Sequence, residues 1–190
     1  MLKYPTGGST PSSPSGVFIG DEHADLVHVI QLTASISEFA SNGIQALFIE
    51  AFYASSPPTS TDVESLGNYI RSRNFDHTTT ENGKNELPIC YEGLLQRCER
   101  ANMPICGVDS QVPPDIANLK KGKAFKMIRW RTTTVNDDWQ RAIQESCQAN
   151  GWSKFALFGG KAHAAALSSR FGARLTTQIW DRTAKQYVDL

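Results

Sequence analysis

The sequence predicts an α/β protein in which a mostly parallel central sheet is flanked by helices on both faces. Short apolar runs that are typical of buried strands alternate along the chain with longer segments whose apolar residues recur at helical spacing. Several connections between successive runs are long enough to cross over the sheet, as parallel strands require. The alternation and the long crossovers together favour a parallel sheet between two layers of helices.

Each element follows from its local pattern. Strands are expected where short apolar runs occur, over residues 17–20, 44–52, 104–108, 154–158 and 175–180, with a further strand or edge segment over 126–130. Helices are expected where the apolar spacing is helical, over residues 25–41, 62–73, 91–102, 136–149 and 162–170. Residues 74–87 are polar and have no clear period, which predicts a long surface loop.

The composition predicts one folded domain behind a flexible N-terminal segment. Residues 5–16 consist of Pro, Gly, Ser and Thr, so we expect residues 1–16 to be a linker that joins the domain to something upstream. Residues 17–190 are expected to be a single domain. No two of the four cysteines have the spacing of a zinc or redox motif, so reduced thiols in a cytoplasm-type, reducing environment are expected.

Charge and hydropathy argue against several classes of partner. The chain has 19 Lys and Arg and 19 Asp and Glu, and this balance gives no indication of a nucleic-acid or membrane-surface partner. No apolar stretch reaches the ~18 residues that a membrane-spanning helix requires. The chain also lacks a signal peptide's apolar segment, a Gly-x-Ser-x-Gly elbow, a P-loop and a His-Glu-x-x-His motif.

The strongest functional clue is a pattern that occurs twice: an apolar run, a glycine, two further residues and a histidine. The first copy runs from Gly20 to His23 and the second from Gly160 to His163. Each copy falls where a strand should end, and ligands of open α/β sheets bind beyond the carboxyl ends of the strands. The two histidines are therefore expected to meet at one site.

The first copy adds an acid to the imidazole. Side chains alternate along extended backbone, so Asp21 and His23 should point one way and Glu22 the other. Asp21 and His23 would then form an acid/imidazole pair. The alternative is that Asp21 is a helix N-cap and that Glu22 and His23 lie on an exposed first helical turn.

Glu50 is a carboxylate within the otherwise apolar run of residues 47–52. A charge in a buried strand is costly unless it is paired or liganded, which favours a role in a site. Burial would raise its pKa, whereas a cation or a metal would lower it. Alternatively, Glu50 lies near the end of the strand and simply emerges into solvent.

His163 follows a Gly-Gly turn and begins an Ala-rich helix. A helix N-terminus disfavours an imidazolium, so the neutral form is expected, which suits a metal ligand or a general base. Gly159 and Gly160 could also bring backbone N–H groups close to an oxyanion. The alternative is a surface histidine on the first turn.

Three further residues are candidates for a supporting role at the same edge: Asp109, Arg131 and Asn136. Asp109 ends the third strand, but it could equally be a turn residue. Arg131 could be a solvated cation, and for Asn136 we favour the role of helix N-cap. His28 and His77 are expected to be peripheral.

The order of these motifs resembles the Tiki-like superfamily, which includes erythromycin esterases, ChaN-type haem-uptake proteins, TraB-type proteins, the Tiki metalloproteases and a toxin branch. The resemblance covers residues 18–180 and is supported by residues 87–95, residues 104–109, and Arg131 followed by Asn136. These segments are most similar to the toxin branch. That branch includes a domain of the Pasteurella multocida toxin and the Ras/Rap1-specific endopeptidase of large bacterial toxins.

The resemblance implies a Tiki-like α/β fold and a hydrolase that cleaves a peptide or another acyl bond. It implies a catalytic set of Asp21, His23, Glu50 and His163. It also implies a toxin or effector domain within a larger chain, secreted and acting in a host cell on a protein or a small acyl substrate. Asp21 departs from the pattern, because several branches have Glu at that position.

Two mechanisms fit these residues. In one, His23, His163 and Glu50 bind a divalent metal (Zn, Mn or Fe) whose bound water attacks a carbonyl. In the other, no metal is needed: Glu50 or Asp21 activates water, and a histidine donates a proton or stabilises the intermediate. Two alternatives without catalysis stay open. One is a ChaN-like carrier of haem or another ligand, and the other is an inactive toxin module for targeting or interaction, which the shortened Asp21 suggests.

Overall fold

The central sheet brings the carboxyl ends of five parallel strands to one edge. The computed structural model describes residues 2–22, 25–54, 68–69, 81–117 and 124–190, and six strands lie within them. Their order across the sheet is β3-β2-β4-β1-β5-β6. They are β1 Ser15–Asp21, β2 Ala46–Tyr53, β3 Ile105–Asp109, β4 Lys154–Gly160, β5 Leu175–Asp181 and β6 Gln186–Asp189. Strands β1 to β5 pair in parallel, and β6 pairs antiparallel with β5.

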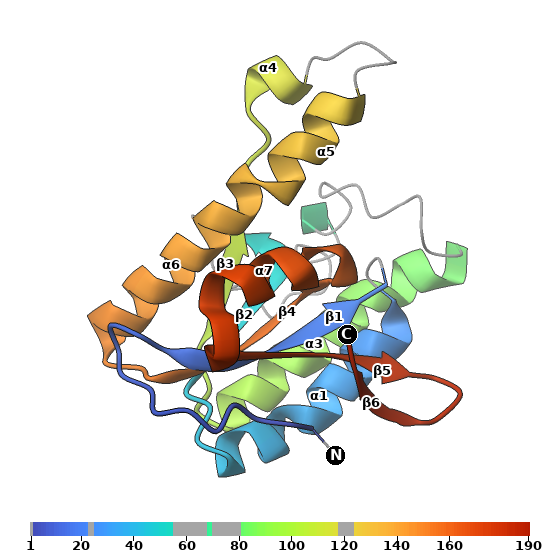
Figure 1. Ribbon diagram of the computed structural model, residues 1–190. Helices are drawn as coiled ribbons and strands as arrows, with labels where there is room; N and C mark the ends of the chain where they lie inside the picture. Colours follow the sequence, from blue (N-terminus) through green and yellow to red (C-terminus); the bar gives the residue numbers. More distant parts are fainter. Residues whose placement is uncertain (1, 23–24, 55–67, 70–80, 118–123) are drawn as a thin grey trace.

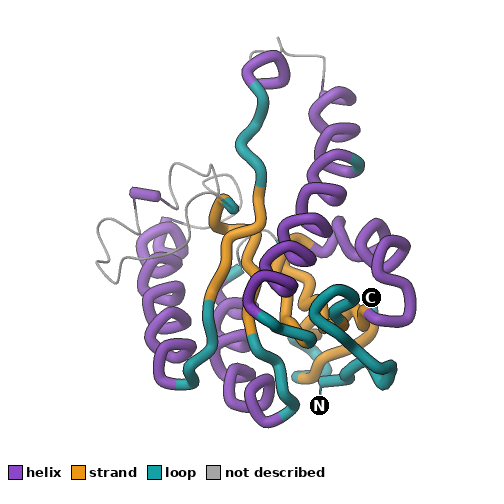
Figure 2. The backbone as a smooth tube through the Cα atoms, turned by 90° about the vertical axis from the view of Figure 1, so that its left-hand side faces the viewer, coloured by secondary structure: helices purple, strands orange, loops and turns teal. Residues whose placement is uncertain are grey.

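Helices cover both faces of this sheet (Figures 1 and 2). On one face lie α1 Leu26–Ser41 and α3 Glu81–Arg100. On the other lie α6 Thr134–Asn150 and α7 Ala164–Phe171, with the short helical turns η2 Lys161–His163 and η3 Gly172–Arg174 on either side of α7. Figure 1 shows α4 Pro114–Ala117 and α5 Ala124–Thr132 projecting away from the sheet.

Two hydrophobic cores form because the side chains of each strand alternate between the faces. Ile19 of β1 packs with Phe39 of α1 in one core. Its neighbour Phe18 packs in the other core with Trp139 of α6 and Leu167 of α7. Strands that are buried on both faces carry continuous apolar runs rather than alternating ones. This is why the strand signals were clear in the sequence.

The predicted fold class is confirmed: a mostly parallel sheet lies between helices on both faces. One expected element is wrong, because residues 126–130 lie in helix α5 rather than in a strand. Met127 is half-buried and Trp130 is buried, three positions apart, while Lys126 and Arg129 are exposed. A run this short carries too few residues for its period to separate helix from strand.

The expected loop over residues 74–87 is also wrong for its described part, because α3 begins at Glu81. Leu87, Tyr91 and Leu94 of α3 are buried, whereas residues 81–86 are polar or glycine, so the first turns carry little apolar signal of their own. The edge strand β6 was not expected. Of the helix expected over residues 62–73, only residues 68–69 lie among those described, and they are helical.

The N-terminal segment makes contacts with the last strands. Leu2 is buried in the core on the α1 side. The backbone N–H of Lys3 donates to the side chain of Gln178 over 2.9 Å, and the Gln178 amide donates back to the Lys3 carbonyl over 2.8 Å. Ser15 and Gly16 already belong to β1. The division into a linker over residues 1–16 and a domain over residues 17–190 stays a prediction.

Across the part of the chain that the structure describes, none of the helices combines the length and the apolar character needed to cross a membrane.

Candidate active site

Glu50 lies in a row of residues that crosses the sheet near its carboxyl edge. Ile49 of β2 pairs with Phe158 of β4, so the next residue, Glu50, lies beside Gly159. A Cβ atom at Gly159 would lie 3.0 Å from Glu50 Oε2 and 3.0 Å from the Trp139 ring. The glycine therefore leaves the space into which the Glu50 carboxylate folds. This explains the glycine that directly precedes the second copy of the repeated motif.

Protein donors hold both oxygens of the Glu50 carboxylate. Arg131 Nη2 donates to Oε1 over 2.6 Å, and the backbone N–H of Gly160 donates to Oε2 over 2.5 Å. Nε2 of His163 lies 3.7 Å from Oε1. The Glu50 side chain is 14% exposed, so its charge is largely removed from water but is compensated. Glu50 is therefore paired with groups of the protein and does not simply emerge into solvent.

These partners set the protonation state of Glu50. Burial is the largest single influence and raises the pKa of Glu50, but the hydrogen bond and charge of His163, the charge of Arg131 and the Gly160 N–H together lower it by more. The resulting pKa is about 2, below the ordinary value of 4.5. Glu50 is therefore a carboxylate over the whole physiological range of pH.

His163 is held in one orientation by Asn136 and Trp139. Nδ1 of His163 lies 2.9 Å from Asn136 Oδ1, and the amide nitrogen of Asn136 donates to the Arg131 carbonyl over 3.1 Å. Because the amide nitrogen is used in this way, Oδ1 is an acceptor and Nδ1 of His163 carries the proton. The imidazole lies 4.4 Å from the Trp139 ring, centroid to centroid, at 30°. Nε2 is thereby directed to Glu50.

Asp109 is joined to this cluster through Trp139. The indole N–H of Trp139 donates to Asp109 Oδ1 over 3.4 Å, and Asp109 is 3% exposed. Asp109 therefore lies at the same sheet edge, as expected, and holds the ring that stacks on His163. The N-cap role that we favoured for Asn136 is wrong, because Asn136 lies inside α6, is 1% exposed and contacts His163.

Asp21 belongs to a second cluster. Asp21 pairs with Gly160 across β1 and β4, one row beyond Gly20 and Gly159, so alternation directs its side chain to the opposite face from Glu50. Its Oδ1 lies 3.1 Å from Nδ1 of His28 and accepts from the backbone N–H of Asp25 over 3.3 Å. The N-cap of α1, which was the alternative role expected for Asp21, is instead Asp25, whose carboxylate accepts a hydrogen bond from the Val27 N–H.

His28 was expected to be peripheral and is not. It is 2% exposed, and its Nδ1 also accepts from the backbone N–H of Glu22 over 3.1 Å. A signal was available, because His28 stands four residues before Leu32 and eight before Ile36 on the buried stripe of α1. His23, the partner expected for Asp21, lies outside the described residues, as does His77.

Two of the three residues expected to bind a metal, Glu50 and His163, lie among the described residues. Both oxygens of Glu50 are used by protein donors, an arrangement that fits an ion-paired carboxylate better than a metal ligand. Nε2 of His163 faces that carboxylate. Within the described ranges, no three His, Cys, Asp or Glu side chains are grouped as around a metal ion. A requirement for Zn, Mn or Fe stays a prediction.

The fold and the site define an α/β domain with a buried carboxylate and an oriented imidazole at the carboxyl edge of its sheet. No family model matches the chain, and no curated protein matches it. Solved structures do. The type III effector HopBA1 is 21% identical with a TM-score of 0.57, and the match covers 86% of this chain and 76% of that one.

A second similar structure is RRSP, a MARTX toxin effector domain from Vibrio vulnificus CMCP6. It is 12% identical with a TM-score of 0.54, and the match covers 93% of this chain but 35% of that one. The C-terminal region of Pasteurella multocida toxin also matches, at 10% identity and a TM-score of 0.44, over 92% of this chain and 24% of that one. In its fold, the chain is thus similar to bacterial effector and toxin-effector domains. The wider relation to the Tiki-like superfamily stays a prediction.

Proposed function

We propose that this chain is a bacterial toxin or effector domain that hydrolyses a peptide or another acyl bond. The observation that carries the proposal is the pair of Glu50 and His163 at the carboxyl edge, 3.7 Å apart, with Nδ1 of His163 fixed by Asn136. The likeness in fold to HopBA1 and RRSP supports the class of protein. Secretion and action on a protein inside a host cell belong to the same proposal.

The geometry suits activation of a water molecule. Two acceptors 3.7 Å apart can hold one water at ~2.8 Å from each. Arg131 and the Gly160 N–H stabilise the ionised form of Glu50 while His163 is neutral, so Glu50 is a weak proton acceptor and the proton passes to Nε2 of His163, whose Nδ1 already carries one. Glu50 then stabilises the imidazolium that forms, and Asn136 keeps the ring in the tautomer that leaves Nε2 free.

The reaction then balances without a further reactant. The water oxygen forms a bond to the carbonyl carbon as its proton moves to Nε2, and the bond to the leaving group breaks as the imidazolium returns that proton to it. Asp21 and His23 are proposed to stabilise the intermediate or to orient the substrate. Asp109 and Arg131 position Trp139 and Glu50.

One observation favours a second candidate, an inactive module that serves in targeting or interaction. Because both Glu50 oxygens accept from protein donors, the same cluster could be a structural ion pair that closes the edge of the sheet. The two candidates differ in one respect: only the hydrolase needs the charge of Glu50 for turnover.

The test is a comparison of new protein N-termini, enriched and identified by mass spectrometry, after the protein is added to native lysates of plant and animal cells. Wild type should create cleavage products that Glu50→Gln and His163→Ala lose, by about a hundredfold or more in rate. Glu145→Gln, which changes an exposed carboxylate on α6, is the matched control and should cleave like wild type. Repetition after dialysis against a chelator shows whether a metal is required.

Equal product patterns for wild type and Glu50→Gln, with both proteins folded by circular dichroism, would remove Glu50 from the chemistry. If wild type creates no new N-termini in any lysate, the inactive module becomes the better description.

A further inference from the structure

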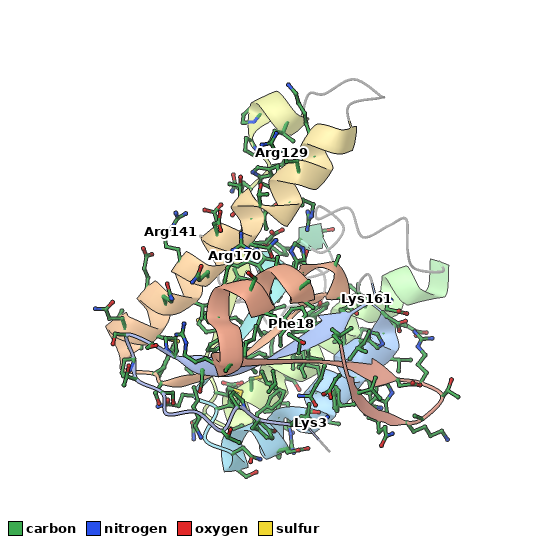
Figure 3. All side chains as sticks on the ribbon, in the orientation of Figure 1. Lys3, Phe18, Arg129, Arg141, Lys161 and Arg170 are labelled. Carbon is green, nitrogen blue, oxygen red and sulfur yellow. The ribbon has the colours of Figure 1, made fainter. Side chains whose placement is uncertain are left out.

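A pocket lies at the carboxyl edge of the sheet, three strands away from Glu50, and His28 of α1 reaches it from the opposite face. It has a volume of about 310 Å³, and its apolar lining comes from Ile179 and Trp180 of β5, Val188 of β6 and Leu190. Lys161, labelled in Figure 3 beside the end of β1, and Glu22 also line it. A cavity of this size is at the lower end of the range for ligand sites and is large enough for one large side chain.

The sheet register links this pocket to the candidate active site. Gly20 of β1 pairs with Gly159 on one side and with Ile179 on the other, and Ile179 pairs with Val188. Glu50 stands next to Gly159 in the same row. Residues of one row point to the same face, so the Glu50 carboxylate and the side chains of Ile179 and Val188 lie on the same face of the sheet.

The backbone provides a second link. The N–H of Gly160 holds the Glu50 carboxylate, and the next residue, Lys161, lines the pocket. A Cβ atom at Gly20 would lie 3.1 Å from the Lys161 Cβ and 2.6 Å from Leu190, so this glycine makes room for two residues that line the pocket to pack over the row. Gly20 and Gly159 therefore have the same effect with different neighbours: each lacks a side chain and leaves room for neighbouring residues to pack over the row.

The charges around the pocket are compensated within the protein. Lys161 forms an ion pair with Glu22, and Arg182 forms one with Asp25. Asp181 accepts from the backbone N–H groups of Thr183 and Ala184 in the turn that follows β5. His28, which also lines the pocket, uses its Nδ1 within the protein, beside Asp21 and the Glu22 N–H. With the charged groups paired, the apolar floor favours an apolar ligand group over a charged one.

We infer that this pocket is a specificity subsite for an apolar side chain of the peptide substrate; the inference rests on the proposed function. Strands lie ~4.8 Å apart, so β2 and β5, three spacings apart, are separated by ~14 Å. An extended peptide advances ~3.3 Å for each residue, so a substrate lying across the strand ends reaches the pocket about four residues from its scissile bond. Large aliphatic or aromatic side chains are selected at that position.

Val188→Glu tests the subsite by placing a carboxylate in the apolar floor. Cleavage in the lysates, read from the new N-termini, should fall at least tenfold at sites with a large apolar residue about four positions from the cut. Gln186→Glu adds the same charge two residues earlier on β6, at an exposed position outside the pocket lining, and should cleave like wild type.

Val188→Phe separates a change of specificity from a general loss of structure. It keeps the floor apolar but reduces the volume, so the preferred side chain should become smaller while other cleavage sites keep their rates. If both Val188 variants cleave the same sites at the same rates as wild type, the subsite is wrong and the hydrolase proposal stands. If the wild-type protein cleaves nothing, the hydrolase proposal and the subsite fall together.

Discussion

At the scale of single residues, Glu50 links the stability of the protein to its proposed chemistry. Its pKa in the folded protein is about 2, whereas its ordinary value is 4.5. A group whose folded pKa is lowered contributes stability that is fully present above its unfolded pKa and is lost as the pH falls through the folded value. A lowering of this size corresponds to roughly 3 kcal/mol, at about 1.4 kcal/mol for each pKa unit.

Glu50→Gln should therefore lower the free energy of unfolding by an amount that depends on pH. The difference from wild type should be largest above about pH 5 and should shrink as the pH falls from about 4.5 towards 2. Chemical denaturation of both proteins at several pH values measures it. A difference that stays constant from pH 7 to pH 2 would show that the ionised carboxylate makes no contribution to the folded state.

Some of the site was predictable from residue types and order, and some was not. Glu50 was found because a charge within an apolar run is unusual, and His163 because it repeats the Gly-x-x-His pattern. The role of Asn136 was missed, since its contact with His163 joins residues 27 positions apart. Near a helix start, an asparagine is explained equally well by local capping, and only packing of α6 against the sheet separates the two roles.

At the scale of elements, β4 ends in two glycines because its neighbours fill the space above them. Glu50 Oε2 and the Trp139 ring would each lie 3.0 Å from a Cβ at Gly159. One added methyl group must therefore displace the carboxylate or the ring. Gly93, on the exposed side of α3, is a matched control, because a Cβ there would meet nothing within 4 Å.

Gly159→Ala should cost ~1–3 kcal/mol of stability through overpacking and should abolish hydrolysis, since the Glu50 carboxylate moves away from the Gly160 N–H. Gly93→Ala should instead raise stability by about 0.5–1 kcal/mol, because alanine favours a helix interior. Thermal melting and the cleavage assay measure both effects. Equal activity in Gly159→Ala and wild type would mean that the carboxylate does not need its present position.

Elements were predictable where the pattern was long and strongly apolar, and less so elsewhere. The strands β2 and β4 lie close to their expected positions, because burial on both faces gives uninterrupted apolar runs. Helix α5 was mistaken for a strand, because it is short and carries few apolar residues. The start of α3 was missed for a related reason: residues 81–86 include no apolar side chain.

At the scale of the whole molecule, two polar clusters lie at the carboxyl edge of the sheet, one on each face. Glu50 and His163 lie on the face of α6 and α7, and Asp21 and His28 lie on the face of α1. A substrate bound across the edge could contact both clusters, because adjacent rows of β1 and β4 point to opposite faces. The sequence predicted one shared edge, and alternation within the strands divides it into two sides.

The position at which the folded domain begins can also be tested. Composition predicts that residues 1–16 are a linker, which would make substitutions there neutral. In the structure, however, Leu2 is 4% exposed and packs in the core on the α1 side, and the backbone of Lys3 satisfies the buried amide of Gln178. These contacts join the first residues to β5, on the side of the sheet far from β2 and β3.

Leu2→Ala should therefore lower the free energy of unfolding by about 2 kcal/mol, because truncating a buried leucine loses its transfer free energy and leaves a cavity. Thr6→Ala, at an exposed position in the same segment, is the control and should change stability little. Denaturation curves of the two variants and wild type decide the matter. If Leu2→Ala unfolds like wild type, the linker prediction holds and the folded domain begins after Leu2; a loss near the expected size extends the domain to the first described residues.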